Sequence, residues 1–210
     1  MSQVLCFGDS ITYGARDTEG GGWATRLRKH LDEKRDADSN FYVIAYNLGV
    51  PGENSDGLRA RFLEETKARV ASLGDEAVLF LIAIGANDAC FTPSKGEFRV
   101  TKERYRENLK DIFANAQQFS ENVIALTITP VVDELAGVPE NQDKSRLNTY
   151  VDQYNVVLKE VAAEMSVTII DVHKAFMEID HTTDFSSDGV HPNSMGHELI
   201  FNQVYNYLRK

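Results

Sequence analysis

The hydrophobic positions of this chain fall into short uninterrupted runs, separated by longer segments that are apolar on one face only. Five runs are rich in β-branched and aromatic residues and are apolar almost continuously, which is typical of strands buried on both faces of a sheet. We therefore expect strands at residues 3–7, 41–47, 77–84, 122–129 and 167–171.

The segments between these runs have the spacing of amphipathic helices. The clearest stripes run from Tyr105 to Ala116 and from Leu147 to Val161, with apolar residues three or four positions apart. An earlier segment has Ser55 as its expected N-cap and a glycine as its stop. In all, helices are expected over 23–34, 55–73 (ending at Gly74), 105–116, 147–161 and 194–208.

Strand alternating with helix along the whole chain predicts the α/β class, with a doubly wound, open parallel sheet and right-handed crossovers. With 210 residues, 42% of them hydrophobic, the chain is expected to form one domain over residues 1–210. The acidic segment 131–144 contains Gly137 and Pro139 and is expected to be a long surface loop. Ligands of such sheets bind outside the carboxyl ends of the strands.

Charge and cysteine content narrow the classes of partner and compartment. The 22 basic and 32 acidic side chains give a net charge of -10, which repels phosphate backbones and anionic lipid, so no nucleic-acid partner is expected. The two cysteines, Cys6 and Cys90, imply no disulfide framework. The first apolar run ends at Gly8, too early for a secretory signal, and no run reaches the roughly 20 residues that a membrane span needs. We therefore expect a cytoplasmic protein without membrane insertion.

Residues suited to nucleophilic catalysis stand at the expected strand ends. Ser10 follows the first strand, and Asp188 lies three positions before His191 near the C-terminus. A serine hydroxyl needs an adjacent base, and a neutral imidazole is the side chain suited to that at neutral pH. The ring needs a carboxylate at its other nitrogen, and a spacing of three in a turn allows that contact. Ser10, His191 and Asp188 are thus the candidate nucleophile, base and orienting acid.

The same loops offer hydrogen-bond donors for the oxyanion of an acyl-transfer reaction. The candidates are the backbone N–H of Ser10, the backbone N–H of Gly52, where a missing side chain lets substrate approach, and the side-chain amide of Asn87. We expect the neighbouring Asp9 and Asp88 to hydrogen-bond the loops that hold Ser10 and Asn87, rather than to act as acids or bases. Glu53 is expected to be solvated.

Four sequence blocks resemble those of the SGNH hydrolases, also called GDSL-type esterases and lipases. "FGDSITYG", "GVPGENS", "IGAND" and "DGVHPNSMGH" match the blocks of that family in order and across nearly the whole chain. The resemblance implies a three-layer α/β/α sandwich with strand order 2-1-3-4-5 and no cofactor. It also implies Ser10, Asp188 and His191 as the catalytic triad and Ser10, Gly52 and Asn87 as the oxyanion hole. Ile11 stands where the family has leucine, and both residues are apolar.

Each motif, taken alone, is also compatible with a function other than that of a serine esterase. Gly-Asp-Ser alone is typical of a turn, and a phosphate-binding loop would need a glycine-rich fingerprint that the sequence lacks. His191 and His197 could be metal ligands, but no cysteine or carboxylate cluster completes such a site, so no metal is expected. A glycan-binding module, a thioesterase and a lysophospholipase remain alternatives, the first made less favoured by the complete triad.

The expected substrate is a small ester with a short acyl group, such as an acetyl ester of a sugar or small alcohol, because no extended apolar cap is visible. The expected oligomeric state is a monomer or weak homodimer. We expect the pocket walls to come from loop 89–100, with Phe91 and Phe98, and from loop 130–143, with Pro130, Val131 and Val132.

Overall fold

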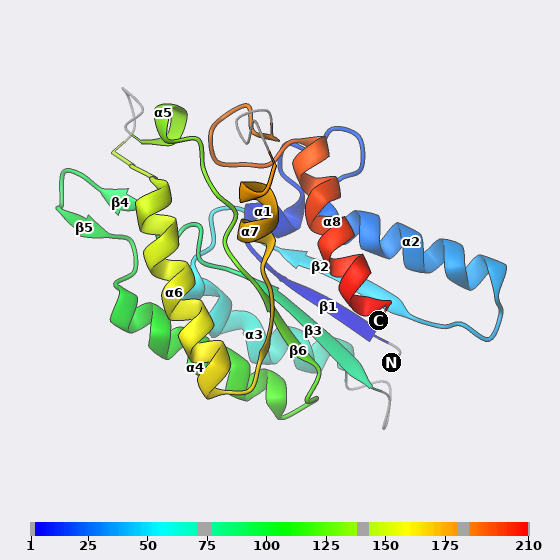
Figure 1. The fold of residues 1–210 in the computed structure, drawn as a ribbon. Coiled ribbons are helices and arrows are strands. Elements are labelled where there is room, and N and C mark those ends of the chain that lie inside the picture. Colours follow the sequence, from blue (N-terminus) through cyan, green and yellow to red (C-terminus); the bar gives the residue numbers. More distant parts are fainter. Residues whose placement is uncertain (1–2, 71–76, 138–142, 180–184, 210) are drawn as a thin grey trace.

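The parallel sheet expected from the sequence is present in the computed structural model, which describes residues 3–70, 77–137, 143–179 and 185–209. The five strands pair in parallel in the order β2-β1-β3-β6-β7, which confirms the expected order 2-1-3-4-5 of the five runs. They are β1 (Gln3–Gly8), β2 (Ile44–Gly49), β3 (Val78–Ala83), β6 (Val123–Leu126) and β7 (Thr168–Ile170) (Figure 1).

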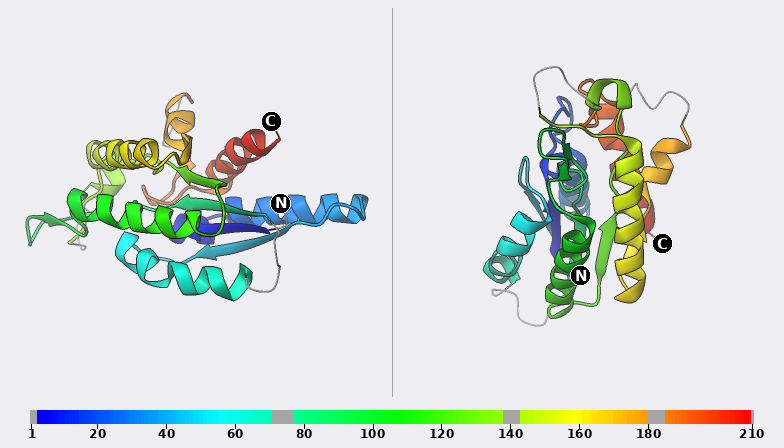
Figure 2. Two further views of the ribbon diagram at one scale, coloured as in Figure 1. Left: turned by 90° about the horizontal axis from the view of Figure 1, so that it is seen from below. Right: turned by 90° about the vertical axis from the view of Figure 1, so that its left-hand side faces the viewer.

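Helices cover both faces of this sheet, so the fold is the expected α/β/α sandwich (Figure 2). One core cluster joins the sheet to α2 (Trp23–Ala37), α7 (Val172–Met177) and α8 (Ser194–Leu208). The other joins it to α3 (Ser55–Val70), α4 (Lys102–Gln117) and α6 (Asn148–Glu164).

The central strand β1 explains why the strand runs are continuously apolar. Leu5 and Phe7 point into one core cluster, while Val4 and Cys6 point into the other. Successive side chains of a strand alternate between the two faces, and here each face lies under helices. The Phe7 ring lies 4.5 Å from that of Phe62 on α3. The β1 strand is therefore fixed from both sides, and its carboxyl end is held in place.

The start of α3 differs from the prediction by one residue. Asn54, not Ser55, caps this helix, because its Oδ1 accepts the N–H of Gly57 at 3.1 Å. The Ser55 hydroxyl instead donates to Asp88 on another loop and accepts from the Asn108 amide at 2.8 Å, so it serves contacts other than a cap. The expected stop at Gly74 lies outside the described residues.

Five short elements were not predicted, among them the helices α1 (Ser10–Tyr13) and α7 (Val172–Met177). A hairpin of β4 (Phe91–Thr92) and β5 (Glu97–Phe98) follows β3, and the short helix α5 (Asp133–Ala136) lies within the expected surface loop. Two-residue strands and helices of four to six residues show too little periodicity to be recognised from the sequence.

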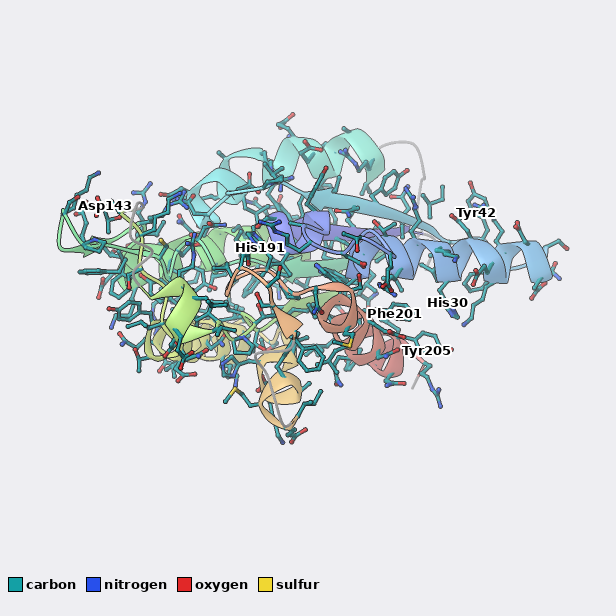
Figure 3. The ribbon with its side chains drawn as sticks, turned by 90° about the horizontal axis from the view of Figure 1, so that it is seen from above. His30, Tyr42, Asp143, His191, Phe201 and Tyr205 are labelled. Carbon is teal, nitrogen blue, oxygen red and sulfur yellow. The ribbon has the colours of Figure 1, made fainter. Side chains whose placement is uncertain are left out.

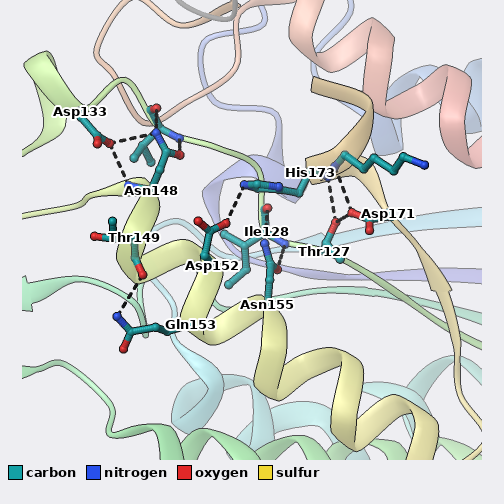
Figure 4. Close-up of polar contacts among 12 residues, drawn as sticks. Thr127, Ile128, Asp133, Asn148, Thr149, Asp152, Gln153, Asn155, Asp171 and His173 are labelled. Carbon is teal, nitrogen blue, oxygen red and sulfur yellow. Dashed lines mark hydrogen bonds and ion pairs between the residues drawn. The ribbon is translucent and has the colours of Figure 1, made fainter. Parts of the chain in front are cut away.

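The loop after β6, which carries α5, is fastened to α6 by side-chain amides (Figure 4). The Asn155 amide pairs with both backbone groups of Ile128, at 2.8 and 3.1 Å. Asn148 at the start of α6 donates from its backbone N–H to Asp133 at 2.8 Å and from its amide to the Val131 carbonyl at 2.8 Å. These bonds fix the position of α5 above the sheet.

Among the described helices, none combines the length and the apolarity needed to cross a membrane.

Candidate active site

The sharp turn at the end of β1 places Ser10 at the start of the short helix α1 (Ser10–Tyr13). At Gly8 a Cβ would lie 2.2 Å from the Thr12 hydroxyl and 2.3 Å from the Ala83 carbonyl, so the turn closes only with glycine. The Asp9 carboxylate then caps α1 by accepting the Ile11 N–H at 2.9 Å. The chain thus uses Gly8 for space and Asp9 for capping, and holds Ser10 at the sheet edge.

The structure brings His191 to Ser10 across 181 positions of sequence. Ser10 Oγ lies 2.8 Å from His191 Nε2, and His191 Nδ1 lies 2.8 Å from Asp188 Oδ2. The other Asp188 oxygen accepts the backbone N–H groups of Val190 and His191 at 3.0 and 2.8 Å, which closes the turn around the ring. Figure 3 shows His191 near the middle of the upper end of the molecule. Hydroxyl, imidazole and carboxylate form one hydrogen-bonded chain.

The electrostatics of this chain define its protonation. Burial acts to raise the pKa of Asp188, but the hydrogen bonds from His191 and Val190 outweigh it and hold the pKa well below its usual range. Asp188 is therefore ionised at neutral pH and accepts a hydrogen bond from the Nδ1–H of His191. In the neutral ring this leaves the Nε2 lone pair facing the Ser10 hydroxyl, the arrangement that a general base requires.

Arg16 also contacts the triad carboxylate, a contact that the sequence did not predict. Its Nε donates to Asp188 Oδ2 at 3.1 Å, the same oxygen that faces the His191 ring. Arg16 adopts a positive φ of 71°, an uncommon conformation for a residue with a side chain. Its sequence position, in the loop after the serine, gives no signal for this contact.

The three expected oxyanion donors lie around one open pocket of about 560 Å³, lined by Ser10, Gly52, Asn87 and His191 among others. Gly52 has a φ of +80°, and no atom lies within 4 Å of where a Cβ would be. The Asn87 amide is fixed in orientation, because Nδ2 donates to the Glu53 carbonyl at 2.9 Å while Oδ1 accepts from Arg99 at 3.1 Å. The second Nδ2 hydrogen remains for a ligand.

Asp9 and Asp88 are buried carboxylates next in sequence to the pocket residues Ser10 and Asn87. Asp88 does not bind its own loop alone: it reaches across to Ser55, accepting the backbone N–H at 3.0 Å and the hydroxyl, and so joins the Asn87 loop to α3. Burial raises the pKa of Asp9 to about 7 and that of Asp88 to about 6, against hydrogen bonds from Ile11 and Ser55 that lower them.

Two expectations about the surroundings of the site were wrong. Glu53 is not solvated. Its side chain is 8% exposed and forms an ion pair with Arg61, whose Nε donates to Glu53 Oε1 at 2.8 Å. Phe91 and Phe98 pack on each other and on Tyr150, at centroid distances of 5.3, 5.9 and 5.2 Å. The described part of the pocket wall includes neither ring.

Both expected loops contribute to the described wall, but through residues other than those expected, Arg99 from one and Leu135 and Ala136 from the other. Pro130, Val131 and Val132 are absent from the wall, because the turn of α5 brings Leu135 and Ala136 forward instead. The remaining lining residues that were not singled out from the sequence are Ala15, Arg16, Pro51, Ala86, Arg99, Lys144, Arg146 and Val190.

His197 is a structural residue on α8. It is fully buried, with Nδ1 accepting the Trp23 N–H at 3.3 Å and Nε2 donating to the Ala15 carbonyl at 3.1 Å. Burial lowers its pKa, which keeps the ring neutral. Over the described ranges, no group of three or more His, Cys, Asp or Glu side chains could hold a metal ion.

Comparison with known proteins identifies the family to which the protein belongs. A model of the GDSL-like Lipase/Acylhydrolase family matches residues 6–199. The chain belongs to this family. Isoamyl acetate-hydrolyzing esterase 1 homolog of Rattus norvegicus is 28% identical to this acylhydrolase over 220 residues, which cover 99% of the chain and 82% of the relative. The acetylxylan esterase of Geobacillus stearothermophilus is 24% identical over 164 residues, covering 75% and 68%.

Solved structures agree with the family assignment. The lipase/acylhydrolase from Enterococcus faecalis superposes with a TM-score of 0.73 at 25% identity, covering 100% of this chain and 96% of the other. An α/β hydrolase from the metagenome of Lake Arreo gives a TM-score of 0.73 at 23% identity over 98% and 94% of the two chains, a likeness of fold. This GDSL-like acylhydrolase is a carboxylic ester hydrolase.

Proposed function

We propose that this acylhydrolase hydrolyses carboxylic esters with short acyl groups, such as acetyl esters of sugars or small alcohols, through an acyl-enzyme on Ser10. The observation that carries the proposal is the hydrogen-bonded chain from Ser10 Oγ to His191 Nε2 and from His191 Nδ1 to Asp188 Oδ2, with both distances 2.8 Å. A serine flanked by a base and an orienting carboxylate is the arrangement of nucleophilic acyl transfer.

In the first half-reaction Ser10 Oγ attacks the ester carbonyl while His191 Nε2 takes the hydroxyl proton. The tetrahedral intermediate collapses, His191 returns that proton to the leaving alcohol, and the acyl group stays on Ser10. Water then attacks the acyl-enzyme with His191 again as base, which releases the carboxylic acid and restores the hydroxyl. Asp188 remains ionised throughout and balances the charge on the ring.

The oxyanion that forms in each half-reaction would receive hydrogen bonds from Ser10 N–H, Gly52 N–H and the Asn87 amide. All three residues line the same pocket as His191. The first N–H groups of a helix have no partner within the helix, so the Ser10 N–H at the start of α1 is available to a ligand. Donors fixed in advance lower the barrier because they need no reorganisation as charge develops.

The preference for short acyl groups rests on two observations. The names of two relatives refer to acetyl esters, isoamyl acetate and acetylxylan. The described wall of the pocket combines charged and polar side chains with apolar residues that are mostly small, which suits a short acyl group better than a long one. The apolar lining residues are Ile11, Ala15, Pro51, Ala86, Leu135, Ala136 and Val190.

The decisive experiment compares wild type with Ser10→Ala. We expect wild type to hydrolyse p-nitrophenyl acetate and to be labelled by a fluorophosphonate probe, and Ser10→Ala to do neither while its melting temperature is unchanged. A folded wild type that stays unlabelled and inactive across neutral pH would refute the proposal and favour a binding module. In a chain-length series, a maximum at a long acyl chain, from octanoyl upward, would refute the short-acyl preference. Faster turnover of acetyl thioesters or lysophospholipids than of acetyl esters would identify those substrates instead.

We also infer a cytoplasmic location and a monomeric or weakly dimeric state. Cys6 and Cys90 are both free and buried in the described structure, which suits a reducing compartment. Cell fractionation and sedimentation velocity test the two inferences, and a periplasmic or secreted pool, or a tight oligomer at micromolar concentration, would contradict them.

A further inference from the structure

One wall of the active-site pocket is cationic, although the chain as a whole is acidic. Arg16, Arg99, Lys144 and Arg146 line the pocket together with Asp188, the one acidic side chain among its described residues. Asp188 is already engaged by Arg16 and His191. The other three cations have no carboxylate within ion-pair distance in the described part of the chain, whereas eight of the twelve arginines do.

The backbone directs this wall toward the pocket. Ser145 exchanges two hydrogen bonds with Phe91 of β4, at 2.9 and 2.8 Å, so residues 144–146 run as an extended segment beside the hairpin. Alternate side chains of an extended segment point to opposite sides. Ser145 is buried, and Lys144 and Arg146 therefore share the other side, which faces the pocket. Arg99 follows β5 directly and is tied by its N–H to the Cys90 carbonyl at 2.9 Å.

The cations lie next to the expected oxyanion site. Arg99 and Arg146 both donate to Asn87 Oδ1, at 3.1 and 3.4 Å, and the amide of Asn87 is the proposed oxyanion donor. Hydrogen-bond lengths place these guanidinium groups no more than about 8 Å from the position of the oxyanion. Arg146 Nε is buried and has no hydrogen-bond partner in the described structure. The acceptor that the two arginines share here, Asn87 Oδ1, is neutral. A guanidinium group forms its strongest hydrogen bonds with a charged acceptor, such as a carboxylate or a phosphate.

We propose that the preferred substrate of this esterase carries an anionic group, a carboxylate or another oxyanion, a few bonds from the scissile ester, and that Arg99, Lys144 and Arg146 bind it. The inference rests on the proposed function and adds the charge of the substrate to it. Guanidinium groups match oxyanions in geometry as well as charge. The net charge of -10 opposes anions at long range, but salt screens that field within about 8 Å, whereas contacts inside the pocket are screened much less.

Two pairs of matched esters test the proposal, one for each side of the ester bond. On the acyl side, p-nitrophenyl hydrogen glutarate is compared with p-nitrophenyl pentanoate. On the alcohol side, 4-acetoxyphenylacetate is compared with 4-ethylphenyl acetate. The measured quantity is the ratio of kcat/KM for the anionic ester to that for its neutral partner. We expect at least tenfold in one pair for wild type, falling as NaCl is raised to about 1 M.

Variants of the cationic wall residues test whether these residues cause the preference for the anionic ester. Arg99→Gln and Lys144→Gln should each lower the ratio at least threefold, and Arg99→Lys, which keeps the charge, should retain most of it. Using the ratio cancels any effect of Arg99 on the Asn87 amide. The matched control Lys29→Gln removes an exposed charge on α2, outside the pocket wall, and should leave the ratio unchanged.

The outcomes separate this inference from the proposed function. Ratios at or below one in both pairs, with neutral esters hydrolysed through Ser10, would refute the anionic substrate and leave the esterase intact. A wild-type preference that both glutamine variants retain would refute the assignment to this wall. No hydrolysis of any ester by folded enzyme would refute the proposed function itself.

Discussion

The buried carboxyl of Asp9 should make the stability of this protein fall as the pH rises toward neutrality. Asp9 is 2% exposed and caps α1 through the Ile11 N–H at 2.9 Å. Burial raises its pKa from 3.8 to about 7, and the nearby carboxylates of Asp88 and Glu53 add to the rise. Replacing Asp9 with asparagine keeps a capping acceptor of similar size and removes the titration.

The expected magnitude follows from proton linkage. Between pH 3.8 and about 7 the folded state holds a proton on Asp9 that the unfolded chain has lost, so the free energy of unfolding decreases with pH. One bound proton corresponds to about 1.4 kcal/mol per pH unit. Between pH 3.8 and about 7 the titration of Asp9 therefore lowers the free energy of unfolding by about 4 kcal/mol in total. Above about pH 7 no further loss is expected, because Asp9 is then ionised in both states. The stabilisation is fully present only below the unfolded pKa.

Urea denaturation measures this effect. Wild type and Asp9→Asn are compared at closely spaced pH values between the pKa of Asp9 in the unfolded chain and its pKa in the folded protein. We expect the free energy of unfolding of wild type, minus that of the variant, to fall by about 1.4 kcal/mol per pH unit and then to level off. Asp88, whose pKa is raised to about 6 by burial, titrates in both proteins and largely cancels. The control Glu33→Gln removes a carboxylate that is 63% exposed and should give a flat difference. A flat or rising difference for Asp9→Asn would refute the reasoning.

Three further predictions concern the pocket and its support. Asn87→Ala should lower kcat for p-nitrophenyl acetate about 100 to 1000-fold with little change in KM, and an unaffected kcat would exclude the amide as an oxyanion donor. Gly52→Ala should cost about 1–2 kcal/mol in urea denaturation and lower kcat/KM at least tenfold, because φ is +80° there, and wild-type kinetics would contradict that. Arg61→Met should cost about 3–5 kcal/mol of unfolding free energy by leaving the buried Glu53 carboxylate unpaired, and adding Glu53→Gln should restore part of it. An additive double variant would refute that pairing.

The sheet and the meeting of Ser10 with His191 could be predicted because both follow from regular structure. Continuous apolar runs indicate strands covered on both faces, and parallel strands bring their carboxyl ends to one edge. The residues after β1 and before α8 therefore lie together whatever their distance in sequence. The structure places these two side chains within hydrogen-bond distance, 2.8 Å apart.

The parts that failed depend on partners that no local pattern shows. Ser55 looks like an N-cap, but its hydroxyl donates to Asp88 and accepts from Asn108, 33 and 53 positions away. Asn54 caps α3 instead. Glu53 looks solvated until Arg61, within α3, folds back onto it. The cations of the pocket wall lie in loops, where a single charge usually faces solvent. The pairing of Ser145 with β4 places Lys144 and Arg146 on the pocket side, and no local pattern shows that pairing.

The buried ring of His197 has a consequence for trapping the enzyme with its substrate. It bridges α8 to the segment that follows Ser10, through the Ala15 carbonyl and the Trp23 N–H, at 3.1 and 3.3 Å. His197 thus ties the loop after Ser10 to α8, next to the segment that carries His191, without taking part in the reaction. Inactive variants such as Ser10→Ala should keep an assembled cleft, and soaking their crystals with intact ester should capture the complex before cleavage.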